Sequence, residues 1–195
     1  HIDSINTNNE GIMSKAPGAD DNASGISVVT EVIRVLVDKA YMPSHKIVFF
    51  AYAAEEVGLK GSFEITENYQ DKGANVLGVL NIDGTNYNGS VQKIVLIDDN
   101  TDGEQNKFIG ELIDTYINVP WGYDSCDYAC SDHYAWTYRG YKASFPAEAL
   151  IAEENPFIHT EADTLENMGN TASHSVLFGR LALAYILEMD KSSHY

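Results

Sequence analysis

Two short segments of the sequence end apolar runs with carboxylates that could bind a metal ion. Glu55 and Glu56 are adjacent and directly follow the run FFAYAA, and Asp83 ends another apolar run. Two neighbouring carboxylates are costly to bury without a partner, so one could bind a cation while the other reaches a metal-bound water. For two glutamates on their own, an exposed loop pair is the simpler interpretation.

The other candidate ligands are an acidic pair before a helical pattern and two histidines. Asp20 and Asp21 precede this helix, where N-capping accounts for one acid but not for both. His159 lies in a segment without helical or strand periodicity. His1 stands two residues before Asp3, which would suit a ligand oriented by a neighbouring carboxylate.

Each of these residues has an ordinary structural interpretation when taken alone. Together they form the ligand set of a hydrolytic zinc pair, with two imidazoles, three carboxylates and one further carboxylate for proton transfer. The candidate ligands are His1, Asp83, His159, one carboxylate of the pair Asp20 and Asp21, and one of the pair Glu55 and Glu56, with the other glutamate available for proton transfer. His133 lies near this region of the sequence, but we assign it no ligand role.

Apolar runs and amphipathic stretches alternate along the chain, which predicts an α/β fold. Strands are expected at residues 46–53, 76–82, 93–97 and 143–146. Helices are expected at residues 23–40, 61–69, 104–116, 132–138 and 173–189. Sites in open α/β sheets lie beyond the carboxyl ends of strands, which is where Glu55, Glu56 and Asp83 fall.

Composition limits the classes of protein that fit. The 195 residues are 44% hydrophobic and 21% charged, which is typical of one soluble domain covering residues 1–195. A net charge of −17 argues against nucleic-acid binding. The longest apolar run, Ile47–Ala54, is far shorter than the roughly 20 residues that cross a bilayer, so no membrane span is expected. The chain opens with His rather than Met, so we expect a processed or trimmed form or a fragment.

Cys126 and Cys130 are the only two cysteines. Their spacing allows the roughly 4.4 to 6.8 Å between α-carbons that a disulfide requires. We favour a disulfide, which would place the protein outside the cytosol. Two buried free thiols are the alternative.

Five motifs resemble the secreted bacterial leucyl aminopeptidases of the Vibrio type, in zinc metallopeptidase family 28. They are APGADDNASG at residues 16–25, AYAAEEVG at 51–58, DGTNY at 83–87, CDYACSDH at 126–133 and IHT at 158–160. The resemblance implies a three-layer α/β/α fold with a central mixed, mostly parallel twisted sheet. In relatives, strands precede the first ligand histidine, so their absence here predicts an exposed sheet edge and exposed apolar surface.

The same resemblance implies the site. Asp21 bridges two zinc ions, Glu56 and His159 complete one set of ligands, and His1 and Asp83 complete the other. A zinc-bridged water gives its proton to Glu55 and attacks the first peptide carbonyl. Further implied features are Asp3 beside the first histidine, a cis peptide at Asp21–Asn22, the disulfide Cys126–Cys130 and a Tyr128 that donates to the developing oxyanion.

The resemblance also maps an apolar substrate pocket onto Ile97, Cys126, Tyr128, Cys130, Phe145, Ile151 and Ile158. Gly84 and Ala147 stand where relatives place bulky Met and Phe. We therefore expect a wider pocket that accepts a first residue of Phe or Met as readily as Leu.

The expected protein is a secreted, monomeric metalloaminopeptidase whose substrates are peptides with a free N-terminus. Two alternatives stay open. One is an acyltransferase of the glutaminyl cyclase type, which works with a single zinc. The other is a non-catalytic binding domain or an inactive fragment.

Overall fold

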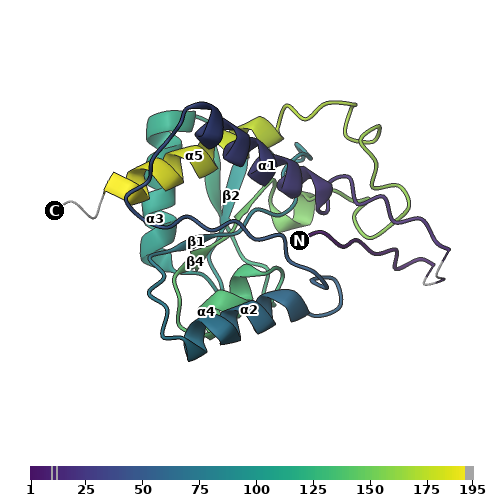
Figure 1. Ribbon diagram of the computed structural model, residues 1–195. Coiled ribbons are helices and arrows are strands. Elements are labelled where there is room, and N and C mark those ends of the chain that lie inside the picture. The colour runs from purple at the N-terminus through teal and green to yellow at the C-terminus, as the bar shows by residue number, and fades with distance from the viewer. Residues whose placement is uncertain (10, 12, 192–195) are drawn as a thin grey trace.

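The computed structural model describes residues 1–9, 11 and 13–191 as a mixed α/β fold (Figure 1). The α-helices are α1 (Ala23–Asp38), α2 (Lys60–Asp71), α3 (Gly103–Leu112), α4 (His133–Tyr138) and α5 (Ser175–Lys191). A π-helical turn, Ile113–Ile117, continues α3, and a 3-10 turn covers Ile151–Glu153. The five predicted helices are confirmed, with the one at 104–116 ending in the π-helical turn.

The strands form two small sheets. β1 (Val79–Leu80) pairs parallel with β4 (Ala143–Ser144). β2 (Ile94–Ile97) pairs parallel with β3 (Trp121–Asp124) and antiparallel with β5 (Pro146–Ala147). The pairing is therefore mixed and mostly parallel, as predicted, whereas a single central sheet in a three-layer fold stays a prediction.

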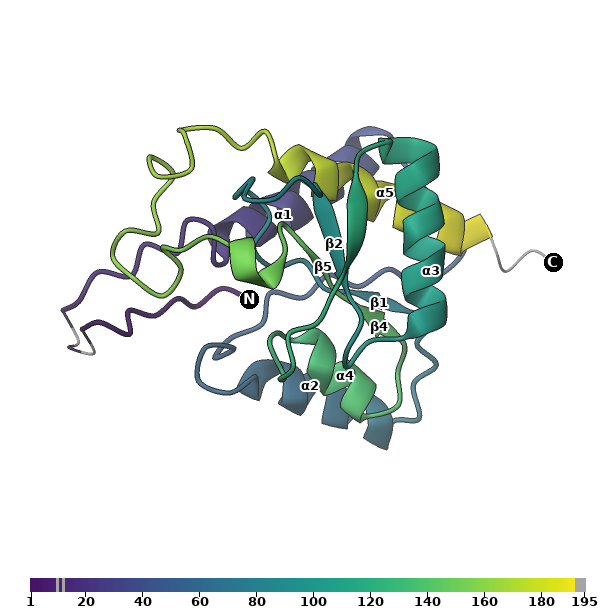
Figure 2. The ribbon, with the colours of Figure 1, turned by 180° about the vertical axis from the view of Figure 1, so that it is seen from behind.

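The helices gather on two sides of the strands. α1, α3 and α5 lie together on one side, and α2 packs against α4 on the other (Figures 1 and 2). All four residues of β2 are fully buried. The main core joins β2 to apolar residues of α1, α3 and α5, including Val32, Ile109 and Phe178. Burial of these apolar side chains is the main force that stabilises the arrangement.

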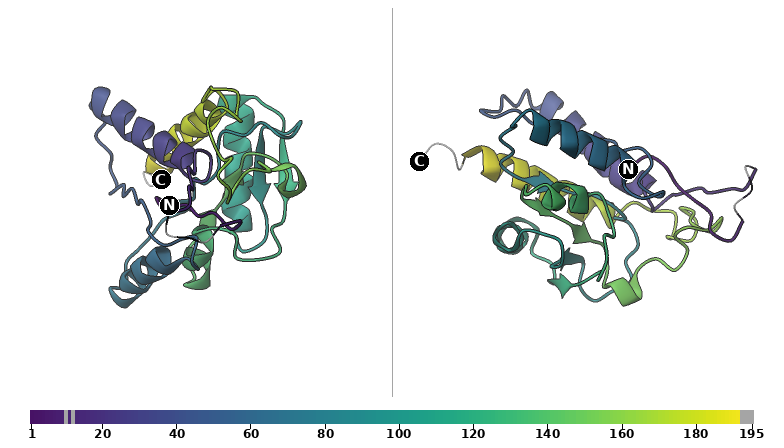
Figure 3. Two further views of the ribbon diagram at one scale, coloured as in Figure 1. Left: turned by 90° about the vertical axis from the view of Figure 1, so that its right-hand side faces the viewer. Right: turned by 90° about the horizontal axis from the view of Figure 1, so that it is seen from below.

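The predicted strand at residues 46–53 is wrong in the part of the chain that the structure describes. The segment is extended but carries no strand pairing. β-branched and aromatic residues favour extended backbone, but a strand also needs a neighbour that supplies a hydrogen-bond ladder. Figure 3 shows the segment between α1 and α2 set apart from the sheets. Val48 and Phe49 in this segment are exposed to solvent.

A cavity of about 680 Å³ lies between this extended segment and residues 76–82, with the end of α5 along one side. Its lining is mainly apolar and includes Ile47, Phe50, Leu80 and Ile186. Within the described residues, no helix is both long and apolar enough to cross a membrane.

Candidate metal centre

Five segments far apart in the sequence deliver the predicted ligands to one place. His1 begins the chain, and Asp21 stands just before α1, whose N-cap is Asn22. Glu55 and Glu56 lie between the extended segment and α2, and Asp83 follows β1. His159 lies in the loop before α5 and has a left-handed backbone, with φ of 59°. The structure brings all six predicted residues together.

The first group of donors surrounds the imidazole of His1. Its Nε2 lies 3.0 Å from Asp21 Oδ1 and 3.3 Å from Asp83 Oδ1. Glu55 Oε2 is the next carboxylate oxygen, at 3.7 Å. His1, Asp21 and Asp83 each offer a donor atom, and these atoms all lie within 4.8 Å of one another.

The second group of donors shares Asp21 with the first. His159 Nε2 lies 2.9 Å from Asp21 Oδ2 and 3.0 Å from Glu56 Oε2. The two oxygens of Asp21 thus face different histidines. This is the arrangement that a carboxylate needs in order to bridge two cations.

The ionisation of these groups reflects crowding of acids around two imidazoles. Burial lowers the pKa of His1, but hydrogen bonds with Asp21 and Asp83 outweigh burial and raise it to about 12. Hydrogen bonds with Asp21 and Glu56 raise the pKa of His159 to about 10. Burial, followed by repulsion from Asp83, raises the pKa of Glu55 to about 8. In the metal-free protein, His1, His159 and Glu55 therefore tend to hold protons, and these protons supply the positive charge that a bound metal ion would otherwise provide.

One unsatisfied atom shows that the donor set fits a cation. Glu56 Oε1 is buried and has no hydrogen-bond partner among the described residues. A buried carboxylate oxygen is costly to leave unpaired. Two imidazoles with three carboxylates are a donor set that zinc accepts, so these residues fit zinc.

Two neighbouring side chains hold the donors in place. Asp3 accepts hydrogen bonds of 3.2 Å from the backbone N–H groups of Glu55 and Glu56. His1 Nδ1 lies closer to the backbone oxygen of Asp3, at 3.0 Å, than to its carboxylate, at 3.5 Å. Asp3 therefore orients the glutamates directly and the histidine mainly through its backbone. Ser131 Oγ donates a hydrogen bond of 2.6 Å to Asp83 Oδ2.

A buried network behind Asp21 was missed by the sequence analysis. Asp163 accepts hydrogen bonds from the backbone N–H groups of Asp20 and Asp21. Asn155 donates to Asp20 and Asp163. Glu148 lies close by, and its burial, followed by the charge of Asp20, raises its pKa to about 10. The second acid of the Asp20–Asp21 pair, which capping does not explain, was the only signal for this network.

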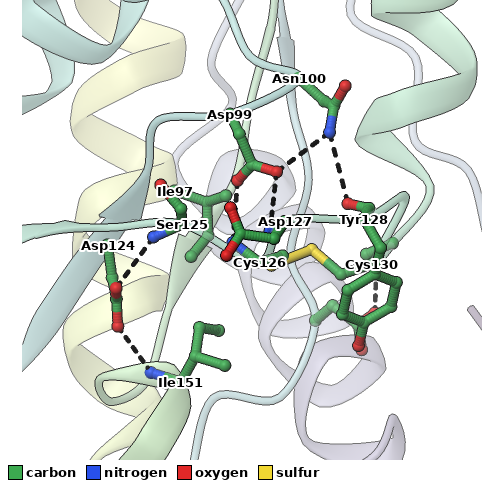
Figure 4. Close-up of a disulfide and its surroundings, with 12 residues drawn as sticks. Ile97, Asp99, Asn100, Asp124, Ser125, Cys126, Asp127, Tyr128, Cys130 and Ile151 are labelled. Carbon is green, nitrogen blue, oxygen red and sulfur yellow. Dashed lines mark hydrogen bonds between the residues drawn. A yellow bond between two sulfur atoms is a disulfide. The ribbon is translucent and has the colours of Figure 1, made fainter.

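Tyr128 and the disulfide lie at the edge of the centre. The disulfide Cys126–Cys130 is present, with α-carbons 6.2 Å apart, and it encloses Tyr128 (Figure 4). Tyr128 is 65% exposed. The pKa of Tyr128 is raised, first by partial burial and then by the negative charge of nearby acids, in the order Glu154, Glu55, Asp21 and Asp83. Its phenol therefore lies in the field of the acidic centre. The predicted cis peptide at Asp21–Asn22 is also present.

Most of the predicted pocket residues pack together. A cluster separate from the main core contains Ile97, Cys126 and Phe145, with Cys130 and Ile151 against it. Ile158 is not among the residues of this cluster. The 680 Å³ cavity is lined by His1 but by none of the cluster's residues, so the two are distinct.

The fold and the donors define a class of α/β protein in which two groups of possible metal ligands share one carboxylate. The chain belongs to peptidase family M28, whose sequence pattern matches residues 1–184. A probable leucine aminopeptidase of Arthroderma benhamiae is 37% identical over 183 residues, covering 91% of this chain and 50% of the relative.

Solved structures agree with this assignment. LapB from Legionella pneumophila is 39% identical with a TM-score of 0.85, over 89% of this chain and 48% of that one. A zinc aminopeptidase from Bacillus subtilis is 26% identical with a TM-score of 0.71, over 88% of this chain and 42% of that one. The chain thus spans about half the length of the relatives that it matches. The narrower likeness to secreted Vibrio-type enzymes stays a prediction.

Proposed function

We propose that this chain forms the metal centre of a zinc-dependent aminopeptidase that removes an apolar first residue, such as Leu, Met or Phe, from peptides. The observation that carries the proposal is the position of Asp21. One of its oxygens lies 3.0 Å from His1 Nε2, and the other lies 2.9 Å from His159 Nε2. The relatives named leucine aminopeptidase and zinc aminopeptidase support the same activity.

Two zinc ions are the proposed cofactors. His1 and Asp83 would hold one ion, Glu56 and His159 the other, and Asp21 both. Bound zinc would supply Lewis acidity and a water of lowered pKa. The protein itself contributes fixed donors, because Asp3 and Ser131 bind Glu56 and Asp83 from outside the centre.

Glu55 is the proposed general base. One of its carboxylate oxygens lies 3.7 Å from His1 Nε2, beside the first donor group. Glu55 belongs to neither of the two groups of possible metal ligands, so its carboxylate is available for proton transfer. Positive charge in the two donor groups would keep its carboxylate ionised, so that it can accept the proton of the attacking water and return it to the nitrogen of the leaving amine. Tyr128 is the proposed hydrogen-bond donor to the oxyanion that forms at the scissile carbonyl.

The apolar cluster of Ile97, Cys126 and Phe145, together with Cys130, Ile151 and Ile158, is the proposed side-chain pocket. Its size is set partly by two small residues. Gly84 has a left-handed φ of 51°, and a Cβ built on it would come no closer than 3.9 Å to Glu148. Ala147 lies inside the cluster. The small side chains at both positions support a pocket wide enough for Phe.

Release of free amino acids from aminoacyl nitroanilides tests this function directly. Zinc-loaded protein is expected to cleave Leu, Met and Phe substrates and to leave the N-acetylated Leu substrate intact. Cleavage of the acetylated compound, or none of any substrate, would contradict an aminopeptidase. Metal content separates the alternatives, because two zinc ions per chain fit the peptidase and one fits a glutaminyl-cyclase-like acyltransferase.

The remaining properties are part of the same proposal. We propose that residues 1–195 act as one folded unit, that the protein is secreted, and that it is monomeric. The disulfide supports an oxidising location. Sedimentation of the zinc-loaded protein and assay of the culture medium would test the last two statements.

A further inference from the structure

Two consecutive residues after β2 hold the backbone of the loop that carries Tyr128. Asp99 Oδ1 accepts a hydrogen bond of 2.8 Å from the Cys126 N–H, and Oδ2 accepts one of 3.0 Å from the Asp127 N–H. The side-chain amide of Asn100 donates 3.3 Å to the Tyr128 carbonyl and 3.1 Å to Asp99 Oδ2. Figure 4 shows these bonds converging on three successive loop residues.

The segment that carries Asp99 and Asn100 is itself held in place. Asp99 and Asn100 follow the fully buried strand β2. The carbonyl of Asn100 accepts a hydrogen bond of 2.8 Å from Thr137 Oγ1 on α4. The Asp99–Asn100 pair therefore joins the Tyr128 loop to the sheet and to a helix.

The loop needs such a support because Tyr128 is largely exposed to solvent. The Tyr128 side chain is 65% exposed, and Asp127 before it has a left-handed φ of 65°. The disulfide closes a loop of only a few residues and does not by itself set the direction of the ring between the cysteines. Contacts between the loop backbone and a rigid element would set that direction.

We propose that Asp99 and Asn100 are positioning residues that hold the Tyr128 hydroxyl toward the reacting carbonyl. The inference rests on the proposed function, in which Tyr128 donates to the oxyanion. The Asp99–Asn100 pair touches neither substrate nor donor group, so it acts only through the tyrosine. Removing the Asn100 amide should therefore lower kcat and leave KM unchanged, because the contact matters in the transition state.

A double-mutant cycle tests this coupling. The four zinc-loaded proteins are wild type, Asn100→Gly, Tyr128→Phe and the double variant. Glycine suits the left-handed φ of 55° at Asn100, so the change removes the side chain without adding strain. We expect Asn100→Gly to lower kcat by about 5- to 10-fold in wild type and by less than about 2-fold in Tyr128→Phe. Equal losses in both backgrounds would overturn the inference.

A matched control separates positioning from stability. Asn118 is also exposed and left-handed, with φ of 57°, at the end of the π-helical turn. Asn118→Gly should leave kcat unchanged, and zinc content should be equal in all variants. Asp99→Asn, which replaces one of the two acceptor oxygens by a donor, should lower kcat at least as much as Asn100→Gly. Unchanged kcat in Asp99→Asn would contradict the role.

A readout without turnover distinguishes this inference from the proposed function. An NMR titration of carbon-labelled tyrosine, with Tyr128→Phe identifying the signal, reports where the phenol lies. In metal-free Asn100→Gly, the pKa of Tyr128 should move back toward the usual value near 10, because the ring loses its partial burial and moves away from the acidic side chains. An unchanged pKa overturns the positioning role even if the protein cleaves no substrate. Absent cleavage with a shifted pKa would count against the proposed function alone.

Discussion

The carboxylate of Asp163 binds the backbone of Asp21, whose amide donates a hydrogen bond of 3.1 Å to Asp163 Oδ2. Asp163 is fully buried and lies on the loop that also carries His159. It therefore fixes the proposed bridging carboxylate relative to one of its own partners. Partners of this kind often affect metal affinity as strongly as they affect stability.

Replacing Asp163 should weaken zinc binding. Asp163→Ala leaves the N–H groups of Asp20 and Asp21 without their acceptor, so we expect zinc affinity to fall by about 10- to 100-fold. Competition with a chromophoric chelator measures the change. Asp71→Ala, at an exposed aspartate at the end of α2, is the control and should bind zinc normally. Wild-type affinity in Asp163→Ala would show that Asp21 holds its position unaided.

Removing the proposed base should abolish turnover while the metal stays bound. Glu55→Gln keeps the size of the side chain but cannot accept the proton, so kcat should fall by about 100- to 10,000-fold. Zinc content, measured by atomic absorption, should stay at two per chain. Glu64→Gln, at an exposed glutamate of α2, should keep full activity. A Glu55→Gln protein with near-normal kcat would remove Glu55 from the mechanism.

Zinc affinity should rise steeply with pH. In the metal-free protein the pKa values of His1 and His159 are raised to about 12 and about 10, so both imidazoles are protonated at neutral pH. Zinc must displace both protons, and the logarithm of its affinity should rise by about 2 per pH unit between pH 6 and 8. Isothermal calorimetry in buffers of different ionisation enthalpy counts the protons released. Release of none would contradict the ligand assignment.

The same histidine contacts affect the stability of the metal-free protein. A raised folded-state pKa stabilises the fold fully below the unfolded value of 6.5, and this contribution is lost as pH rises through about 10 for His159. The unfolding temperature of chelated wild type should therefore fall more steeply from pH 8 to 10.5 than that of chelated His159→Gln.

Filling the proposed pocket should change substrate choice. Ala147 is buried in the cluster of Ile97, Cys126 and Phe145. Ala147→Met should lower kcat/KM for the Phe nitroanilide by about 10-fold or more relative to the Leu compound, since the larger substrate loses its space. Thermal unfolding checks that the variant remains folded. Equal losses for Leu and Phe would place Ala147 outside the pocket.

The buried imidazole of His133 should cause a different pH effect, which acts on the stability of the fold and not on metal binding. It is fully buried, neither ring nitrogen has a hydrogen-bond partner in the described part of the chain, and burial lowers its pKa to about 4. The unfolded chain then binds a proton that the folded one does not, so stability falls as pH drops from 6.5 toward 4. In metal-free protein, His133→Leu should lessen this loss by about 2 kcal/mol at pH 4.5. Urea unfolding at pH 4.5 and 7 measures it, and equal losses in both proteins would refute the effect.

The residues that meet at the candidate centre were predictable because metal binding is restricted to a few residue types. Glu55, Glu56 and Asp83 follow apolar runs, and their positions at the ends of extended segments are visible in the sequence. The supporting residues lack such a signal. Asp163 and Glu148 resemble ordinary surface acids until the fold buries them, and their bonds with Asp21 and Tyr87 join positions more than 60 residues apart.

The strands were less predictable than the helices for a related reason. A helix such as α1 satisfies its backbone locally, so a 3.6-residue apolar pattern is sufficient to locate it. Strand β3, Trp121–Asp124, has no long apolar run and exists because β2 lies beside it. Residues 46–53 have the composition of a strand but no neighbour in the described chain.

The distance along the chain between His1 and His159 has a consequence for biosynthesis. The amide of Thr7 donates a hydrogen bond of 2.9 Å to the His159 carbonyl, so the two histidine segments are fastened to each other directly. During translation, the earlier segments emerge long before the later one. The growing polypeptide therefore lacks the second donor group until residue 159 is made, so the proposed activity would begin only after most of this sequence has been synthesised.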